Sequence, residues 1–255
     1  PKNKFYIYQT EISEKLSKIK RKFGEIIEVH NPSSLDRKKR YPKTKKQYSK
    51  CVFTQEELND DQQLKKICKP CLVGEDIQRY FCLKTKRFTN IKWKEKGIEK
   101  QLSSGTQNWM NQLKIVGQRI TGQVSRRMIF SVDLENRITM PSANIVLLKD
   151  YALRNDEERK RILYYLQALL NSKLINYFYE TQYGEANTNI TSDVLEEMPL
   201  VLEIEPIWEK SEKLSKFYDQ KNKQNEEKIG KLESEIDSEI YQIYGLTKSE
   251  IDIIE

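Results

Sequence analysis

The chain has little of the chemistry on which most enzymes depend. Its 255 residues include one histidine, His30, and four cysteines. A single histidine leaves almost no room for general-base or triad catalysis by histidine. Four cysteines in a chain of this size are too few for a disulfide framework, so a reducing, cytoplasmic setting is expected. No apolar run approaches the length of a membrane span and no signal-peptide pattern opens the chain, so no membrane partner is expected.

The cysteines also make a poor zinc pattern. Cys68 and Cys71 have the two-residue gap of a zinc knuckle, and Cys51 and Cys82 would complete four thiolates. The outer gaps, however, do not form a second knuckle. Ordinary buried or free thiols are therefore the expectation, and no metal site is predicted.

Charge is abundant but unevenly distributed. The net charge of +7 combines a basic half, residues 1–130, with 30 Lys and Arg against 13 Asp and Glu, and an acidic half, residues 131–255, with 15 against 25. Residues 101–130 contain no acid at all. A basic half of this kind favours a polyanionic partner, most commonly nucleic acid, although a solvated Lys-rich surface is the plain alternative.

Hydrophobic periodicity, caps and turn residues predict a mixed chain before residue 150. The predicted elements are a helix over Thr10–Phe23, a short strand within Glu25–His30, an exposed basic loop over Asn31–Lys50, a polar helix over Gln55–Ile67, a turn with a short amphipathic piece over Lys69–Tyr80, and strands within Tyr80–Trp93, Leu113–Thr121, Arg127–Val132 and Arg137–Leu148.

The second half is predicted to be helical. Asn155 is a good N-cap for a long core helix that runs to about Tyr179. Beyond Pro199, apolar residues at three- and four-residue steps predict two antiparallel helices, or one long helix with a solvated middle, and Gly245 with Thr247 marks a stop and a new cap. We expect an α+β fold with a twisted, antiparallel-rich sheet region framed by helices over residues 1–200, and a C-terminal helical arm over 201–255.

Three stretches, in order, resemble one known family. They are KPCLVGEDIQRY at Lys69–Tyr80, ALLNSKLINYFY followed by ITSDVLEEMPL within Asn155–Leu200, and IDSEIYQIYGLTKSEIDIIE at Ile236–Glu255. Together they resemble the TaqI-like specificity (target-recognition) domains of adenine-N6 DNA methyltransferases and Type IIG restriction–modification enzymes. Residues 1–64 carry no motif of that family. The resemblance implies sequence-specific binding of double-stranded DNA, with the methyltransferase or endonuclease domains of the parent protein as the other partner.

The catalytic motifs of such enzymes are missing from these 255 residues. There is no glycine-rich loop for S-adenosylmethionine and no Asn/Asp-Pro-Pro-Tyr/Phe motif to hold a flipped adenine. The segment Gly117–Gly122 has phosphate-loop spacing but lacks the required Lys and Ser/Thr. No cofactor, catalytic residue or small-molecule substrate is therefore predicted here, and S-adenosylmethionine is expected in the catalytic part of the parent.

The predicted site is a DNA interface. Arg pairs with guanine and Gln or Asn with adenine in the major groove, whereas Lys and Arg also hold phosphates. The residues predicted to contact base edges are Gln118, Arg119, Gln123, Arg126 and Arg127. Those predicted to contact the backbone are Arg37, Lys38, Lys39, Arg40, Lys43, Lys45, Lys46, Arg79, Lys84, Lys86, Arg87, Lys92 and Lys94. Trp93 and Trp109 are candidates for stacking, although large aromatic residues are more often core.

Alternatives stay open at this stage. Arg119 could instead be a buried partner of Asp133 or Glu135, and Asp76 is expected to be a structural turn or cap residue. The whole chain could be a specificity subunit of a Type I-like system, for which two tandem recognition halves are expected. It could also be a helical interaction module with no nucleic-acid role, against which the charge asymmetry argues.

Overall fold

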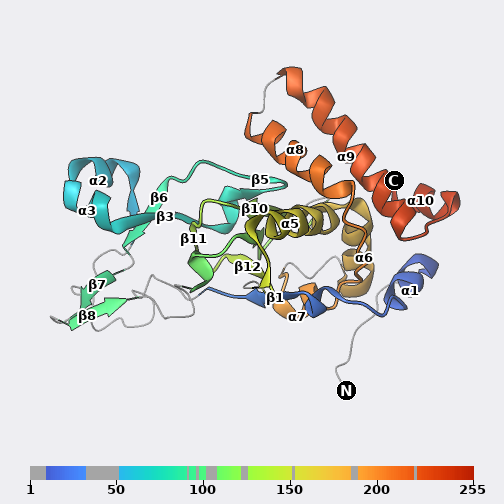
Figure 1. The fold of residues 1–255 in the computed structure, drawn as a ribbon, viewed down its shortest axis with the longest axis horizontal. Coiled ribbons are helices and arrows are strands. Elements are labelled where there is room, and N and C mark those ends of the chain that lie inside the picture. Colours follow the sequence, from blue (N-terminus) through green and yellow to red (C-terminus); the bar gives the residue numbers. More distant parts are fainter. Residues whose placement is uncertain are drawn as a thin grey trace.

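A computed structural model describes residues 10–32, 52–90, 92–95, 98–101, 108–121, 126–150, 153–184, 189–220 and 223–255. The predicted basic loop lies outside the described residues, except for its first two. Figure 1 shows α2, α3 and the β7–β8 hairpin at one end of the long axis and α10 at the other. No helix in the described residues has the length and apolarity needed to cross a bilayer.

The helices and strands follow one another in a mixed order. The helices are α1 (Glu11–Ser17), α2 (Gln55–Asp60), α3 (Gln62–Ile67), α5 (Asp156–Asn171), α6 (Lys173–Tyr183), α7 (Ser192–Glu196), α8 (Ile207–Asp219), α9 (Lys223–Ile243) and α10 (Lys248–Ile254), with 3-10 turns η1 (Phe23–Glu25) and η4 (Gly74–Asp76). The strands are β1 (Ile27–His30), β2 (Val52–Thr54), β3 (Cys68–Leu72), β4 (Ile77–Gln78), β5 (Phe81–Cys82), β6 (Arg87–Asn90), β7 (Lys92–Glu95), β8 (Ile98–Gln101), β9 (Lys114–Gln118), β10 (Phe130–Asp133), β11 (Ile138–Thr139) and β12 (Ala143–Leu148).

Two four-stranded sheets organise the described part of the chain. The larger has the order β1-β12-β9-β10 and is antiparallel throughout. The smaller has the order β11-β3-β6-β2, in which β11 and β3 are parallel and the other pairs antiparallel. Two short hairpins, β4–β5 and β7–β8, complete the pairing. The predicted mixed α+β, antiparallel-rich class is confirmed.

One hydrophobic core joins the larger sheet to the helices. It contains buried side chains from β1, β9, β10 and β12, from α5 and α6, and from the arm helices α8 and α9, including Leu214, Ile236 and Ile240. The predicted apolar face is fully buried, with Leu163, Leu166 and Leu170 on α5 and Leu174 on α6. The helical arm therefore contributes to the core that supports the sheet.

The arm consists of two antiparallel helices, the first of the two predicted alternatives. Lys210 of α8 pairs with Glu239 of α9 at 2.5 Å, whereas Tyr218, later in α8, donates to Glu233, earlier in α9, at 2.9 Å. The two helices lie side by side in Figure 1. Thr247 caps α10 by accepting a hydrogen bond from the backbone of Glu250, as the sequence predicted.

The predicted long core helix is wrong in one respect, because it is broken at Ser172. Ser172 adopts an extended conformation, and its hydroxyl donates to the carbonyl of Leu169 at 2.7 Å and accepts from the amide of Ile175 at 3.1 Å. A serine hydroxyl competes in this way with the helical hydrogen bonds of the backbone. The second helix, α6, then continues to Tyr183 and ends at Gly184, whose φ of 77° favours glycine.

Three other predicted elements also differ. The helix predicted over Thr10–Phe23 ends at Ser17, because the amide of Phe23 instead donates to the carbonyl of Met198 and Leu200 donates to Arg21. The polar helix over Gln55–Ile67 is interrupted at Asp61, which has an extended backbone. The segment Lys69–Tyr80 begins as part of strand β3, not as a turn, because it pairs with β6 and β11.

Candidate nucleic-acid interface

Strand β9 ends in a segment whose main chain is fixed by three neighbours. The amide of Gln118 donates to Ile129, the amide of Arg119 donates to Ser142 at 3.1 Å, and the carbonyl of Arg119 accepts from Ile190 at 2.9 Å. Ile120 forms an isolated antiparallel bridge with Asn189. A backbone held from three sides presents its side chains with little freedom, which base recognition requires.

Arg119 is the cation that this segment presents. Its side chain is half-buried and has no ion-pair partner among the described residues. Asp133, one of the acids considered as its buried partner, is instead held by Lys114 at 3.1 Å and Arg137 at 2.9 Å. Glu135, the other, lies 3.8 Å from Arg137. The guanidinium of Arg119 is therefore not used by either acid.

One of the two polar atoms of the Gln118 side chain has a partner within the protein. Its side-chain nitrogen donates to the carbonyl of Ile77 at 2.7 Å, which links the end of β9 to the start of β4. Its side-chain oxygen has no partner among the described residues. The hydrogen bond fixes the amide plane, so a Gln118 contact to DNA would use the oxygen as an acceptor.

A cavity of about 450 Å³ adjoins the end of β9. It is lined by Val73, Gly74, Glu75, Arg87, Gln118, Ile120 and Ser142. Gly74 and Ser142, two of these residues, are in close contact with each other. The Gly74 amide donates to the Ser142 hydroxyl at 2.9 Å. A Cβ on Gly74 would lie 2.6 Å from the Ser142 carbonyl oxygen. A side chain at position 74 would push these two loops apart, so the glycine is required here.

The other two arginines predicted to contact bases have partners within the protein. Arg127 is 4% exposed, and its guanidinium lies 3.5 Å from the carbonyl oxygen of Gly184. Arg126 lies 3.7 Å from Asp237 of α9, itself buried. Asp237 lies 111 residues further along the chain than Arg126, so local sequence could not reveal this pairing. Arg127 is therefore enclosed by the protein and Arg126 is held beside a buried acid, whereas Gln123 lies outside the described residues.

Two of the arginines predicted to contact phosphates form internal ion pairs. Arg79 pairs with Glu233 of α9 at 2.5 Å. Arg87 pairs with Glu75 and with Asp76, the latter at 3.1 Å. Asp76 also accepts a hydrogen bond from the amide of Val73 at 3.0 Å, which confirms its predicted role as a structural turn residue. These two arginines therefore link elements of the fold, and the predicted phosphate contacts would use those of their donors that are not already paired.

The turn between β5 and β6 presents two lysines instead. Lys84 and Lys86 are exposed and have no ion-pair partner among the described residues. Two other predicted contacts, Lys92 and Lys94, and the stacking candidate Trp93 lie on β7, but only its backbone is described. The basic residues between Arg37 and Lys46 lie outside the described part of the chain.

The second stacking candidate, Trp109, has an internal partner. Its ring stacks on that of His30 with centroids 4.2 Å apart and an interplanar angle of 20°. His30 is the last residue of β1, as its predicted strand-end position implies. This stacking holds the segment before β9 against the edge strand β1.

Sequence reasoning missed a row of carboxamides that supports this region. Strand β10 lies at the edge of the larger sheet, and side chains of α5 and α6 accept hydrogen bonds from amides of β10 and of Met128 just before it. Gln167 accepts from Val132 at 2.7 Å, Asn171 from Phe130 at 3.0 Å, and Asn176 from Met128 at 2.8 Å. Buried edge amides need such partners. In the sequence, the signal for this row is the recurrence of the carboxamides Gln167, Asn171 and Asn176 among the apolar residues of the predicted helix.

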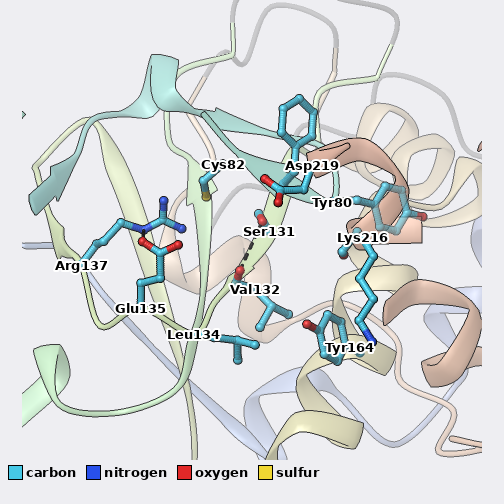
Figure 2. A pocket seen from close by; sticks show the side chains of 12 residues that line it. Tyr80, Cys82, Ser131, Val132, Leu134, Glu135, Arg137, Tyr164, Lys216 and Asp219 are labelled. Atoms are coloured by element: carbon cyan, nitrogen blue, oxygen red, sulfur yellow. Dashed lines mark hydrogen bonds and ion pairs between the residues drawn. The ribbon is translucent and has the colours of Figure 1, made fainter. Parts of the chain in front are cut away.

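A second hollow, of about 200 Å³, lies between β5, β10, α5 and α8 (Figure 2). Tyr80, Phe81, Tyr164 and Lys216 contribute to its wall. Beside it, burial raises the pKa of the Cys82 thiol to about 11, so this cysteine stays protonated at neutral pH. In the described residues no group of three His, Cys, Asp or Glu side chains is placed to hold a metal ion.

Comparison with known proteins identifies the family. Residues 69–200 match the family of TaqI-like C-terminal specificity domains, so the chain belongs to this family. No curated protein matches the sequence. Among solved structures, the fold is similar to that of the Type IIL restriction–modification enzyme MmeI in complex with DNA, with a TM-score of 0.54 at 12% identity. The match covers 87% of this chain and 33% of MmeI, so the chain spans about a third of that enzyme.

Proposed function

We propose that this chain is the DNA target-recognition part of a larger restriction–modification protein, and that this parent protein methylates adenine at N6. The observation that carries the proposal is Arg119: a half-buried arginine for which the described residues supply no acidic partner, on a backbone fixed by Ser142 and Ile190, within the matched region. A cation left unpaired on a rigid support is suited to a bidentate contact with guanine O6 and N7.

Affinity would come from the phosphates. Lys84 and Lys86 are exposed on a turn between strands, where they can bind phosphates. The basic segment over residues 37–46 adds further positive charge. Such contacts release counterions, so binding weakens steeply as salt rises. Specificity and general affinity therefore reside in different residues of the same half of the chain.

Catalysis belongs to the part of the parent outside these 255 residues. The chain lacks the motifs that hold S-adenosylmethionine and a flipped adenine, and it fills only a third of the length of MmeI, which is a restriction–modification enzyme. The chain would position DNA so that one adenine enters a methyltransferase site on a neighbouring domain, with or without a fused endonuclease.

The test measures binding and chemistry separately. Fluorescence anisotropy with a labelled random-sequence duplex should show binding at low salt that falls with rising salt, with log K against log[salt] near −0.9 per phosphate neutralised. Selection from a random duplex pool should enrich one sequence. The chain alone should transfer no labelled methyl group from S-adenosylmethionine to DNA. Salt-independent affinity, or enrichment of no sequence, would refute the proposal.

A further inference from the structure

Ile120 is a large apolar residue that is mostly exposed to solvent. It is 62% exposed and lies two residues beyond the end of β9, after the half-buried Gln118 and Arg119. The backbone bridge to Asn189 fixes its position, so the side chain cannot fold back into the core. A single exposed isoleucine is common on protein surfaces, so it is the position of Ile120, beside Arg119 and on the wall of the cavity, that points to a partner.

The surroundings of Ile120 favour DNA as that partner. Arg119, next to it, has no acidic partner among the described residues, and no acid occurs in residues 101–130. Glu75, the one acid lining the adjoining cavity, is paired with Arg87. The described lining of the cavity therefore sets no uncompensated negative charge against a polyanion that approaches Ile120.

DNA offers one prominent apolar group in the major groove, the 5-methyl group of thymine. Ile120 lines the cavity together with Val73, so a methyl group entering it would meet two apolar side chains. Gln118, on the same cavity wall, is held by its hydrogen bond to Ile77 and keeps the wall in place.

We infer that Ile120 is a specificity-determining residue that contacts the 5-methyl group of a thymine, at a base pair other than the one Arg119 contacts. The inference rests on the proposed function and adds to it a second, chemically different contact. No hydrogen bond is involved, so removing the methyl group from the DNA should have the same effect as shortening the side chain.

The experiment uses selection from two random duplex pools, one with thymine and one with deoxyuridine in its place, applied to the full chain. In the thymine pool the unaltered chain should prefer thymine at one position. In the deoxyuridine pool the preference at that position should fall by about fourfold, which corresponds to the loss of one buried methyl group. Ile120→Ala should lose the same preference in the thymine pool and show no further change in the deoxyuridine pool.

A matched control is available on helix α10. Ile253 is 64% exposed, nearly the same as Ile120, and lies on the arm. Ile253→Ala should leave both selections unchanged. Sedimentation of the chain with and without Ile120→Ala tests a second copy as the partner instead, and a dimer that the substitution dissociates would overturn the inference.

The proposed function and the inference about Ile120 are contradicted by different results. If the unaltered chain enriches no sequence from the thymine pool, the proposed function is refuted and this inference falls with it. If a sequence is enriched but is the same from both pools, or if Ile120→Ala retains it in full, the chain recognises DNA without this contact. In that case the inference alone is wrong.

Discussion

Asn171 binds both main-chain groups of Phe130. Its side-chain nitrogen donates to the Phe130 carbonyl at 2.8 Å, and its side-chain oxygen accepts from the Phe130 amide at 3.0 Å. Helix α5 thus takes the place of a further strand at the edge of the larger sheet. Because β10 is the neighbour of β9, this pair supports the strand that directly precedes Arg119.

Replacing Asn171 with leucine should destabilise the chain by about 1–3 kcal/mol. The buried Phe130 amide would lose its partner, whereas the carbonyl keeps the amide of Tyr80 at 3.0 Å. Urea unfolding measures the change in the free energy of unfolding. Asn59→Ala, at an exposed position of α2, is the control and should stay within about 0.5 kcal/mol. Equal effects of the two substitutions would show that the edge amide finds another partner.

A second prediction concerns pH and Cys71. Burial, reinforced by the charge of Asp76, raises the pKa of the Cys71 thiol from 9.0 to about 12. Between these values the unfolded chain loses its thiol proton and the folded chain keeps it, so the stabilisation is complete below pH 9 and is lost as the pH rises towards 12. Between pH 8 and 10 the chain should lose about 1.4 kcal/mol relative to Cys71→Ala.

The comparison with Cys71→Ala isolates this thiol, because the packing lost in the variant is the same at both pH values. Urea unfolding of both proteins at pH 8 and pH 10 provides the measurement. A constant difference in their free energies of unfolding would show that the thiol ionises as easily in the folded chain as in the unfolded one.

The sequence was informative where a structural signal is local. The cap at Asn155 and the apolar face of α5 could be predicted, because caps and periodicity depend on residues within a few positions. The break at Ser172 could not, because serine also occurs within helices and its effect here depends on tertiary packing. Phe23 shows the same limit: its helical spacing was outweighed by pairing with Met198.

The candidate site shows the limit more clearly. A cluster of basic residues near predicted strands indicated Arg119, Arg126 and Arg127 equally. The structure distinguishes them, because Asp237 lies beside one and the protein interior encloses another. Ile120 was missed, because an isoleucine after a buried strand looks like one more core residue until its exposure is known.

A third prediction concerns the helical arm. Gln167 of α5 donates to Ser211 of α8 at 3.0 Å, the Lys173 amide donates to Asp237 of α9 at 2.9 Å, and both arm helices supply core side chains. Removing residues 201–255 should therefore abolish cooperative unfolding, since the apolar face of α5 would be left in water. Thermal unfolding followed by circular dichroism checks this. A sharp transition in the shortened chain would show that residues 1–200 fold without the arm.

A fourth prediction concerns phosphate contacts. Replacing Lys84 and Lys86 together with alanine should weaken binding to all duplex sequences about equally and make the salt slope shallower by about 1.8. The control is the double substitution of Lys216 and Lys231, which are 63% and 78% exposed on the arm and should leave the slope unchanged. Anisotropy titrations at several salt concentrations measure the slopes. A slope equally reduced in both double variants would indicate an effect of net charge alone.

The last prediction separates the arginines that the sequence could not. Arg119→Ala should relax the sequence preference at one base pair, at a cost of about 1–3 kcal/mol for the correct DNA, because a bidentate guanine contact is lost. Its stability should hardly change, since the side chain has no ion-pair partner among the described residues. Arg119→Lys keeps the charge but not the bidentate geometry and should lose most of the same preference.

Arg127→Ala should instead destabilise the fold, because its buried side chain fills space beside Gly184. Selection from a random duplex pool, paired with urea unfolding of each variant, measures both effects. If Arg119→Ala keeps the full preference while Arg127→Ala loses it at unchanged stability, the assignment of these two residues is reversed.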